Sequence, residues 1–157
     1  MTMEIIANNQ KETENFAKNL AAKLNGGDIV LLYGELGAGK TTLVKSLAKA
    51  LGVKNEITSP TFSLMNVYPV GQRSLVDGRP RRGPFGIEMT KLVHIDTYRL
   101  KNEQELIDIG AEDYLGKSNT ICVIEWPEKI AGLLENKKTM AITIEHVDEN
   151  KRKIITD

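Results

Sequence analysis

Short, mostly apolar runs alternate along the chain with stretches in which apolar residues recur at helical spacing. The runs at Met3–Ala7, Ile29–Tyr33, Lys91–Asp96 and Thr120–Glu125 predict strands, since they are short and rich in β-branched residues. Those starting at residues 29 and 120 are apolar almost throughout, which is typical of strands covered on both faces. This alternation predicts an α/β domain with a largely parallel sheet.

Between these predicted strands, apolar residues recur at the spacing of a helix. One helix follows Asn9, carries an apolar residue at every fourth position from 16 to 24 and ends at Gly26; a second follows the 29–33 strand and ends at Gly52. Residues 102–115 and 127–134 predict further helices, the latter opening with a proline, which suits a first helical turn.

The remaining pattern predicts a strand at Phe62–Tyr68 and a terminal hairpin formed by Lys138–His146 and Lys151–Thr156. At 157 residues, the chain is expected to form one domain spanning 1–157.

Residues 69–90 interrupt the pattern. They hold three of the five prolines, four glycines and the arginines 73, 79, 81 and 82, so they cannot form an interior strand or helix. We interpret them as a basic, Gly/Pro-rich insertion loop within the domain. It is either a mobile hairpin loop or an arm that contacts RNA phosphates or a partner protein.

Composition limits the possible surroundings. Basic and acidic residues both number 21, so the chain has no overall basic field of the kind that coats nucleic acid. Cys122 is the single cysteine and lies in an apolar run, which favours a buried thiol in a reducing compartment. No secretion signal or membrane span is evident, and we expect a cytoplasmic protein without membrane contact.

The strongest chemical signal is GELGAGKTT at Gly34–Thr42, which fits G-x-x-x-x-G-K-[ST] at every fixed position. It follows an apolar strand and opens an amphipathic helix. The glycines at 34, 37 and 39 are expected to adopt positive φ and turn backbone N–H groups inward as an anion nest. The sequence thus predicts a single-domain P-loop NTPase fold, with a mostly parallel central sheet flanked by helices and a C-terminal antiparallel hairpin.

This loop predicts ATP and Mg²⁺ as cofactors. Lys40 is expected to reach the β and γ phosphates, Thr41 to offer its hydroxyl to Mg²⁺ and Thr42 to bond the α-phosphate. The predicted nucleotide contacts within the loop are Glu35, Leu36, Gly37, Ala38, Gly39, Lys40, Thr41 and Thr42.

Two acids end apolar strands, and parallel strands deliver such side chains to one edge of the sheet. Asp96 follows LVHI and Glu125 follows ICVI. We expect both to be Mg²⁺ ligands together with Thr41 and to act in catalysis with Lys40, with Glu125 preferred for positioning the attacking water. Trp126 either packs on the sheet edge or lies near the nucleotide or the partner surface. His94 and His146 are interpreted as ordinary strand residues.

The chain resembles the TsaE family of P-loop ATPases of bacterial threonylcarbamoyladenosine synthesis. The resemblance rests on GELGAGKTTLVKSLAKALG at 34–52, TSPTFSLMNVY at 58–68, HIDTYRL at 94–100, NEQELIDIG at 102–110 with the EDYL that follows, and ICVIEWPEK at 121–129.

This resemblance implies a nucleotide-dependent switch at TSPTF, with Thr58, Ser59 and Thr61 as hydroxyl donors for phosphate or Mg²⁺ and Thr61 among the nucleotide-binding residues. It also places Tyr98 and Arg99 near the same edge. It also implies that both acids named above are functional. The implied partners are TsaD and TsaB, which modify adenosine 37 of tRNAs reading codons that begin with A. The chain would reset that complex rather than transfer the group, and tRNA would be met indirectly or through residues 69–90, where the family usually has few residues.

Two other functions fit the same loop. A small-molecule kinase would need arginines on a closing lid and a second substrate pocket. A nucleotide-sensing module would bind ATP without hydrolysing it.

Overall fold

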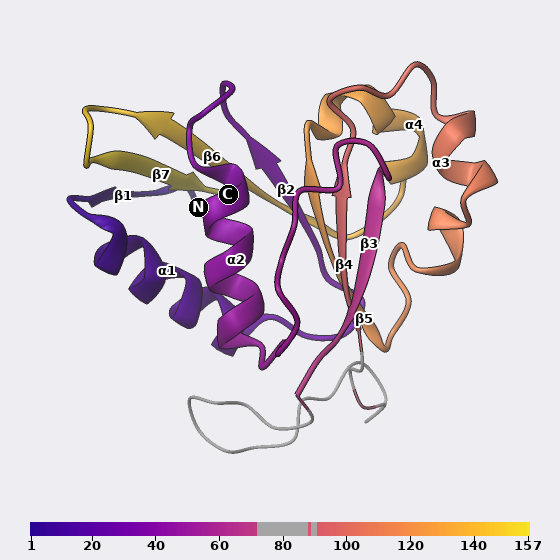
Figure 1. Cartoon of the computed structure of the whole chain (residues 1–157), viewed down its shortest axis with the longest axis horizontal. Coiled ribbons are helices and arrows are strands. Elements are labelled where there is room, and N and C mark those ends of the chain that lie inside the picture. Colours follow the sequence, from indigo (N-terminus) through magenta and orange to yellow (C-terminus); the bar gives the residue numbers. More distant parts are fainter. Residues whose placement is uncertain (72–87, 89–90) are drawn as a thin grey trace.

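The computed structural model describes residues 1–71, 88 and 91–157, and within these residues one mixed sheet of seven strands forms the centre of the molecule (Figure 1). The order across the sheet is β1-β7-β6-β2-β5-β4-β3. The strands are β1 Met3–Ala7, β2 Ile29–Tyr33, β3 Met65–Pro69, β4 Lys91–Asp96, β5 Thr120–Glu125, β6 Thr139–His146 and β7 Arg152–Thr156. The helices are α1 Gln10–Lys23, α2 Lys40–Ala50, α3 Gln104–Asp108 and α4 Ala131–Leu134, with 3₁₀ turns at Ala111–Asp113 and Pro127–Ile130.

The central strands β6, β2, β5 and β4 pair in parallel, whereas β3, β7 and β1 are joined antiparallel to their neighbours. β6 and β7 form the C-terminal antiparallel hairpin. The α/β fold class expected from the sequence is therefore confirmed.

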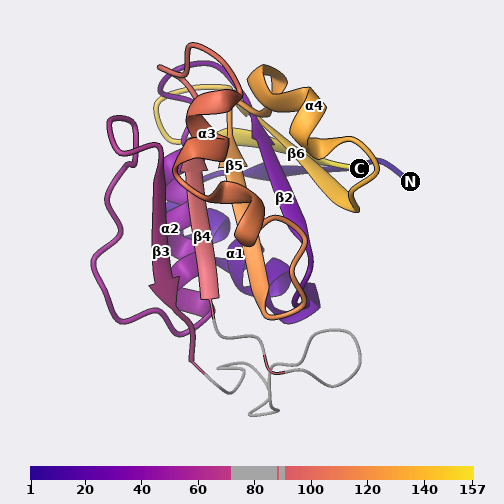
Figure 2. The ribbon, with the colours of Figure 1, turned by 90° about the vertical axis from the view of Figure 1, so that its right-hand side faces the viewer.

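Helices cover both faces of this sheet. α1 and α2 lie side by side on one face, and α3 and α4 lie on the other (Figures 1 and 2). Successive residues of a strand point to opposite faces, so Val30 and Leu32 enter the larger core beneath α1 and α2, and Ile29 and Leu31 enter the smaller core on the α3 side. Continuous apolar strands are needed because neither face meets water.

The same alternation decides on which face of the sheet the polar residues at the ends of β4 and β5 lie. On β5, Ile121 and Val123 face the core beneath α2, and Glu125 follows them on that face at the carboxyl end. On β4, Leu92 faces this core, so His94 and Asp96 share its side. Three polar residues are thus brought toward the start of α2.

The predicted strand bounds at residues 3–7, 29–33, 91–96 and 120–125 agree with the structure. Three predicted elements, one strand and two helices, have different bounds in the structure. β3 begins only at Met65, because residues 61–63 form a turn and Leu64 has a positive φ of 68°.

The continuous helices expected at 102–115 and 127–134 are each interrupted. Gly110 has a φ of 85° and ends the helical run after α3, and the chain resumes as a 3₁₀ turn. Pro127 opens a 3₁₀ turn before α4.

The insertion predicted at 69–90 lies, apart from 69–71 and residue 88, outside the described residues. Pro69 at the end of β3 and Lys91 at the start of β4 are paired in the sheet. Among the described residues, no helix is long and apolar enough to cross a membrane.

Candidate functional site: a phosphate loop facing two carboxylates

The loop between β2 and α2 has the backbone conformation that its glycines predict. Gly34, Gly37 and Gly39 have φ values of 144°, 80° and 108°. A Cβ atom at position 34 would also lie 2.5 Å from the carbonyl oxygen of Ile144. Gly39 precedes the first turn of α2, where backbone N–H groups have no partner within the helix. The loop therefore ends at a helix N-terminus suited to bind an anion.

Lys40 is the cation of this loop and is only 5% exposed. Its Nζ donates to the carbonyl oxygens of Gly34, at 2.6 Å, and Glu35, at 2.9 Å, and lies 4.2 Å from the centre of the Trp126 ring. Burial lowers the pKa of Lys40 from its ordinary value, and the nearby carboxylates, first that of Glu125, act in the opposite direction. A desolvated ammonium group of this kind gains strongly from an approaching anion.

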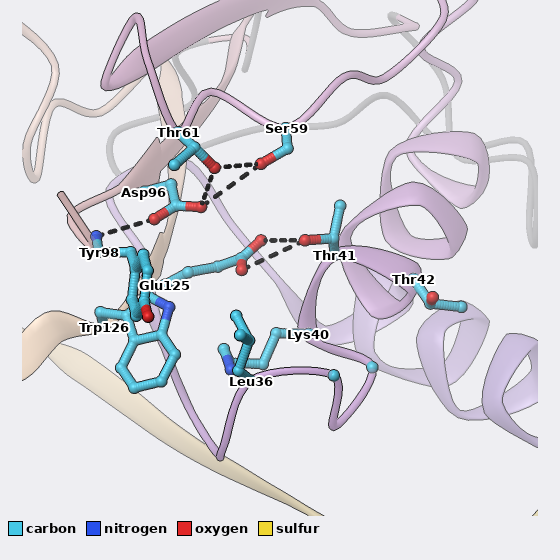
Figure 3. A pocket seen from close by; sticks show the side chains of 12 residues that line it. Leu36, Lys40, Thr41, Thr42, Ser59, Thr61, Asp96, Tyr98, Glu125 and Trp126 are labelled. Carbon is cyan, nitrogen blue, oxygen red and sulfur yellow. Dashed lines mark hydrogen bonds between the residues drawn. The ribbon is translucent and has the colours of Figure 1, made fainter. Parts of the chain in front are cut away.

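Thr41 and Glu125 connect the loop to the sheet. The Thr41 hydroxyl donates to Oε1 of Glu125 at 3.0 Å and lies 3.3 Å from Oε2 (Figure 3). Glu125 is 3% exposed. A hydroxyl has one hydrogen and two lone pairs, so this bond uses the hydrogen and leaves the lone pairs of Thr41 for a cation.

Asp96 organises a second group of hydroxyls. Its Oδ2 accepts from Thr61 at 3.1 Å and from Ser59 at 3.5 Å, and its Oδ1 accepts from the backbone N–H of Tyr98 at 2.9 Å (Figure 3). The hydroxyls of Ser59 and Thr61 are themselves 2.8 Å apart. Thr58, also expected to supply a hydroxyl, instead accepts from the side chain of Asn66 and does not line the pocket.

Aromatic rings close one side of the pocket. Trp126 and Tyr98 have ring centres 5.0 Å apart (Figure 3). Trp126 has a positive φ of 60° and directly precedes Pro127, a position where extended backbone is favoured, so the backbone is strained here. The Thr97 hydroxyl donates to the carbonyl oxygen of Trp126 and helps to hold this conformation.

A single pocket of about 260 Å³ collects most of the predicted site. Its lining residues are Leu36, Gly37, Gly39, Lys40, Thr41, Thr42, Ser59, Thr61, Asp96, Tyr98, Glu125 and Trp126. Two predicted loop residues do not line it. Glu35 is exposed and Ala38 is buried, and both take part through backbone carbonyl oxygens, Glu35 with Lys40 and Ala38 with Arg152.

A second hollow of about 220 Å³ adjoins this pocket and shares Gly39 and Thr42 with it. It is lined by Gln10 and Thr13 of α1 and by residues of the β6–β7 hairpin, including Arg152. The Arg152 Nε donates to the carbonyl oxygen of Ala38 at 2.9 Å and so ties the hairpin to the phosphate loop.

Two residues that contact the site, Arg152 and His94, were not predicted from the sequence to do so. Arg152 carries no local motif, and only the pairing of β7 beside the loop reveals its role. His94, interpreted as an ordinary strand residue, is fully buried, with Nε2 2.8 Å from Oε1 of Glu125. Its spacing of two residues from Asp96 would have indicated a shared face of the strand.

The arrangement supplies a cation, the N-terminus of α2 and two carboxylates around one cavity. Among the described residues, no group of three or more His, Cys, Asp or Glu side chains is placed to hold a metal ion. A divalent cation here would therefore need oxygens from its ligand as well as from Thr41, Glu125 and Asp96. That donor set, hydroxyl and carboxylate, suits Mg²⁺ bound to phosphates.

The fold and this loop together define the chain as a P-loop protein of the α/β class. The family model described as "Threonylcarbamoyl adenosine biosynthesis protein TsaE" matches residues 7–154, and the chain belongs to the TsaE family.

Individual relatives agree with this assignment. The tRNA threonylcarbamoyladenosine biosynthesis protein TsaE of Aquifex aeolicus is 35% identical over 96% of this chain and 92% of its own. The TsaE protein of Bacillus subtilis is 32% identical over 93% of this chain and 79% of its own. The crystal structure of Bacillus subtilis YdiB matches with a TM-score of 0.71 at 27% identity, covering 99% of this chain and 84% of that one.

Proposed function

We propose that this protein is a Mg²⁺-dependent ATPase that serves threonylcarbamoylation of adenosine 37 in tRNAs reading codons that begin with A. In this proposal it acts with TsaD and TsaB, whose complex it resets between turnovers without transferring the group itself. The proposal is supported by the relatives, which are named tRNA threonylcarbamoyladenosine biosynthesis proteins.

The observation that carries the proposal is the convergence of Lys40, Thr41, Asp96 and Glu125 on one pocket at the end of a phosphate loop. Lys40 would exchange its carbonyl partners for the β and γ phosphates. Mg²⁺ would be held by the Thr41 hydroxyl and the phosphates, with Asp96 and Glu125 nearby. Bound there, the ion would neutralise charge that develops on the phosphates during hydrolysis.

The nucleoside would occupy the second hollow. Gly39 and Thr42 border both cavities, so a chain of phosphates in the first pocket would pass Thr42 and lead into the hollow beside Gln10 and Thr13. This continuity supports a nucleotide rather than a free phosphate as the ligand.

Glu125 is the preferred group for orienting the attacking water, because it is buried, faces the pocket and is already bonded to Thr41. Asp96 accepts hydrogen bonds from Thr61 and Ser59, which belong to the segment predicted to be a switch. A metal ion bound near Asp96 would change these bonds and so the conformation of that segment.

The kinase alternative finds less support in the described part of the chain. The described residues include two arginines, and both already have contacts. Arg99 lies over the Phe62 ring at 4.5 Å, and Arg152 donates to the carbonyl oxygen of Ala38. Phosphoryl transfer to a panel of nucleosides and metabolites at a rate above hydrolysis would favour this alternative.

The deciding experiment is reconstitution of adenosine 37 modification with TsaD, TsaB, threonylcarbamoyl-adenylate and excess tRNA. Wild-type protein should give many products per complex, whereas Lys40→Ala and omission of the protein should both give about one. Equal product in all three mixtures would refute the role in resetting the complex. Binding of ATP without any Mg²⁺-dependent release of phosphate, with TsaD and TsaB present, would favour the sensor alternative.

A further inference from the structure

The side chain of His94 is the most unusual buried group outside the pocket lining. It lies on β4 between Asn66 of β3 and Val123 of β5 in the sheet register, and it is fully buried. Its Nε2 lies 2.8 Å from Oε1 of Glu125. An ionised carboxylate only accepts hydrogen bonds, so Nε2 is the donor in this contact.

The other ring nitrogen has no such contact. Nδ1 of His94 is buried and has no hydrogen-bond partner among the described residues. A buried polar atom left unpaired costs on the order of 1–3 kcal/mol. An apolar residue would avoid that cost but would remove one of the donors of the buried Glu125. The packing alone thus gives no reason for a histidine, whereas the contact with Glu125 does.

The two oxygens of Glu125 are held unequally. Oε1 accepts from both His94 and Thr41, at 2.8 and 3.0 Å, whereas among the described residues Oε2 has only the longer 3.3 Å contact with Thr41. Oε2 is therefore the oxygen with spare capacity to accept from a water molecule. Thr41 lies at the start of α2 and would adjust when its hydroxyl meets a cation. His94 belongs to a central strand and keeps its place.

We propose that His94 is a positioning residue that fixes the Glu125 carboxylate through Oε1 and so aims Oε2 at the attacking water. The inference rests on the proposed hydrolytic function and adds to it a residue that touches neither nucleotide nor metal. Misplacing a reacting group by about 1 Å can cost on the order of 100-fold in rate, so loss of this anchor should appear in hydrolysis rather than in binding.

Three substitutions separate this role from packing. In His94→Gln the amide nitrogen reaches nearly as far as Nε2, and in His94→Asn it reaches only as far as Nδ1. His94→Leu fills similar space and donates nothing. The full-length protein is assayed with TsaD and TsaB under single-turnover conditions with Mg²⁺ and ATP. Affinity for ADP is followed in parallel by the fluorescence of Trp126, the only tryptophan.

We expect His94→Leu and His94→Asn to lower the hydrolysis rate by at least about tenfold with unchanged ADP affinity, and His94→Gln to retain most of the wild-type rate. Adding His94→Leu to Glu125→Gln should cause no further loss, because the histidine acts only through that carboxylate. Equal rates for wild type and His94→Leu, equal loss in the Gln and Leu variants, or a parallel loss of ADP binding would overturn the proposal. If wild type hydrolyses no faster than Lys40→Ala, the ATPase assignment itself fails.

Discussion

The hydroxyl of Thr41 and the carboxylate of Glu125, 3.0 Å apart, link the first turn of α2 to the end of β5. This bond joins the residue expected to ligate the cation to the residue expected to orient water. Phosphate binding and water activation are therefore adjacent in space but are carried by separable groups.

Glu125→Gln should keep nucleotide binding and lose turnover. The amide retains the shape and the hydrogen bonds but is a poor acceptor for a proton from water, so we expect a fall in hydrolysis rate of about 100-fold or more. The measurement is single-turnover phosphate release, with ADP affinity followed by Trp126 fluorescence. Glu128→Gln, an exposed acid three residues along, is the matched control. Equal loss of binding and hydrolysis in Glu125→Gln would mean that Glu125 chiefly holds the metal.

Lys40→Ala should weaken ATP binding by at least about tenfold. A hydrogen bond to a charged group contributes roughly 1.5–3 kcal/mol, and Lys40 is the cation of the phosphate loop. Affinity is measured by calorimetry because the substitution also removes the cation over the Trp126 ring. Lys45→Ala, exposed on the same helix, should bind as wild type. Unchanged affinity in Lys40→Ala would contradict the assignment of the loop.

Arg152→Ala should make the phosphate loop less rigid, although Arg152 is not part of that loop. The substitution leaves the carbonyl oxygen of Ala38 without its donor and frees the β6–β7 turn, whose carbonyl oxygens at Asp148 and Lys151 also accept from Arg152. We expect nucleotide affinity to fall by about tenfold and the melting temperature by a few degrees. Lys151→Ala, on the same turn, is the control. Wild-type affinity in Arg152→Ala would show that the loop keeps its shape without the tether.

Cys122 should be inert to alkylation in the folded protein. Burial raises the pKa of its thiol from 9.0 to about 12, so at pH 8 only about one molecule in ten thousand carries the thiolate. The unfolded chain releases this proton near pH 9 and the folded chain does not, so the free energy of unfolding should fall as pH rises from about 9 to 12 and be unaffected below that range. Iodoacetamide labelling, native against denatured, measures the first effect. Rapid native labelling at pH 8 would contradict the burial.

Replacing residues 72–87 with a short turn should leave ATP hydrolysis intact. The replaced segment precedes β4 in the chain, and Lys91, which begins this strand, is about 16 Å from Asp96, which ends it and lines the pocket. Hydrolysis and tRNA modification are measured side by side. Loss of tRNA modification alone would favour the basic-arm interpretation of the insertion, and loss of hydrolysis would mean that the segment supports the core.

The parts of the fold that local pattern controls could be predicted from sequence. Buried strands such as β2 and β5 are continuous apolar runs, and the phosphate loop is specified by glycines whose positive φ no other residue adopts as easily. The two acids could be predicted to lie together at the pocket because they end such runs. The break at Gly110 and the change from a 3₁₀ turn to α4 after Ile130 were missed, because helical spacing continues across both.

What sequence could not supply depends on neighbours distant in the chain. His94 becomes informative only once β4 and β5 pair in a register that puts it beside Glu125. Arg152 becomes informative only once β7 lies beside the loop. The spacing of His94 from Asp96 indicates a shared face of the strand, but its contact with Glu125, like that of Arg152 with the loop, is set by sheet order.

The sheet order also bears on how the protein is made. β2, which carries the phosphate loop, pairs with β5 and β6, and both are encoded far downstream. As the chain leaves the ribosome, the glycine-rich loop therefore emerges long before the strands that flank β2. It also emerges long before Glu125 and Arg152, which contact the loop. The pocket is completed only after Glu125 and Arg152 have been synthesised, so a ligand bound there would stabilise the folded domain and not the early stages of folding.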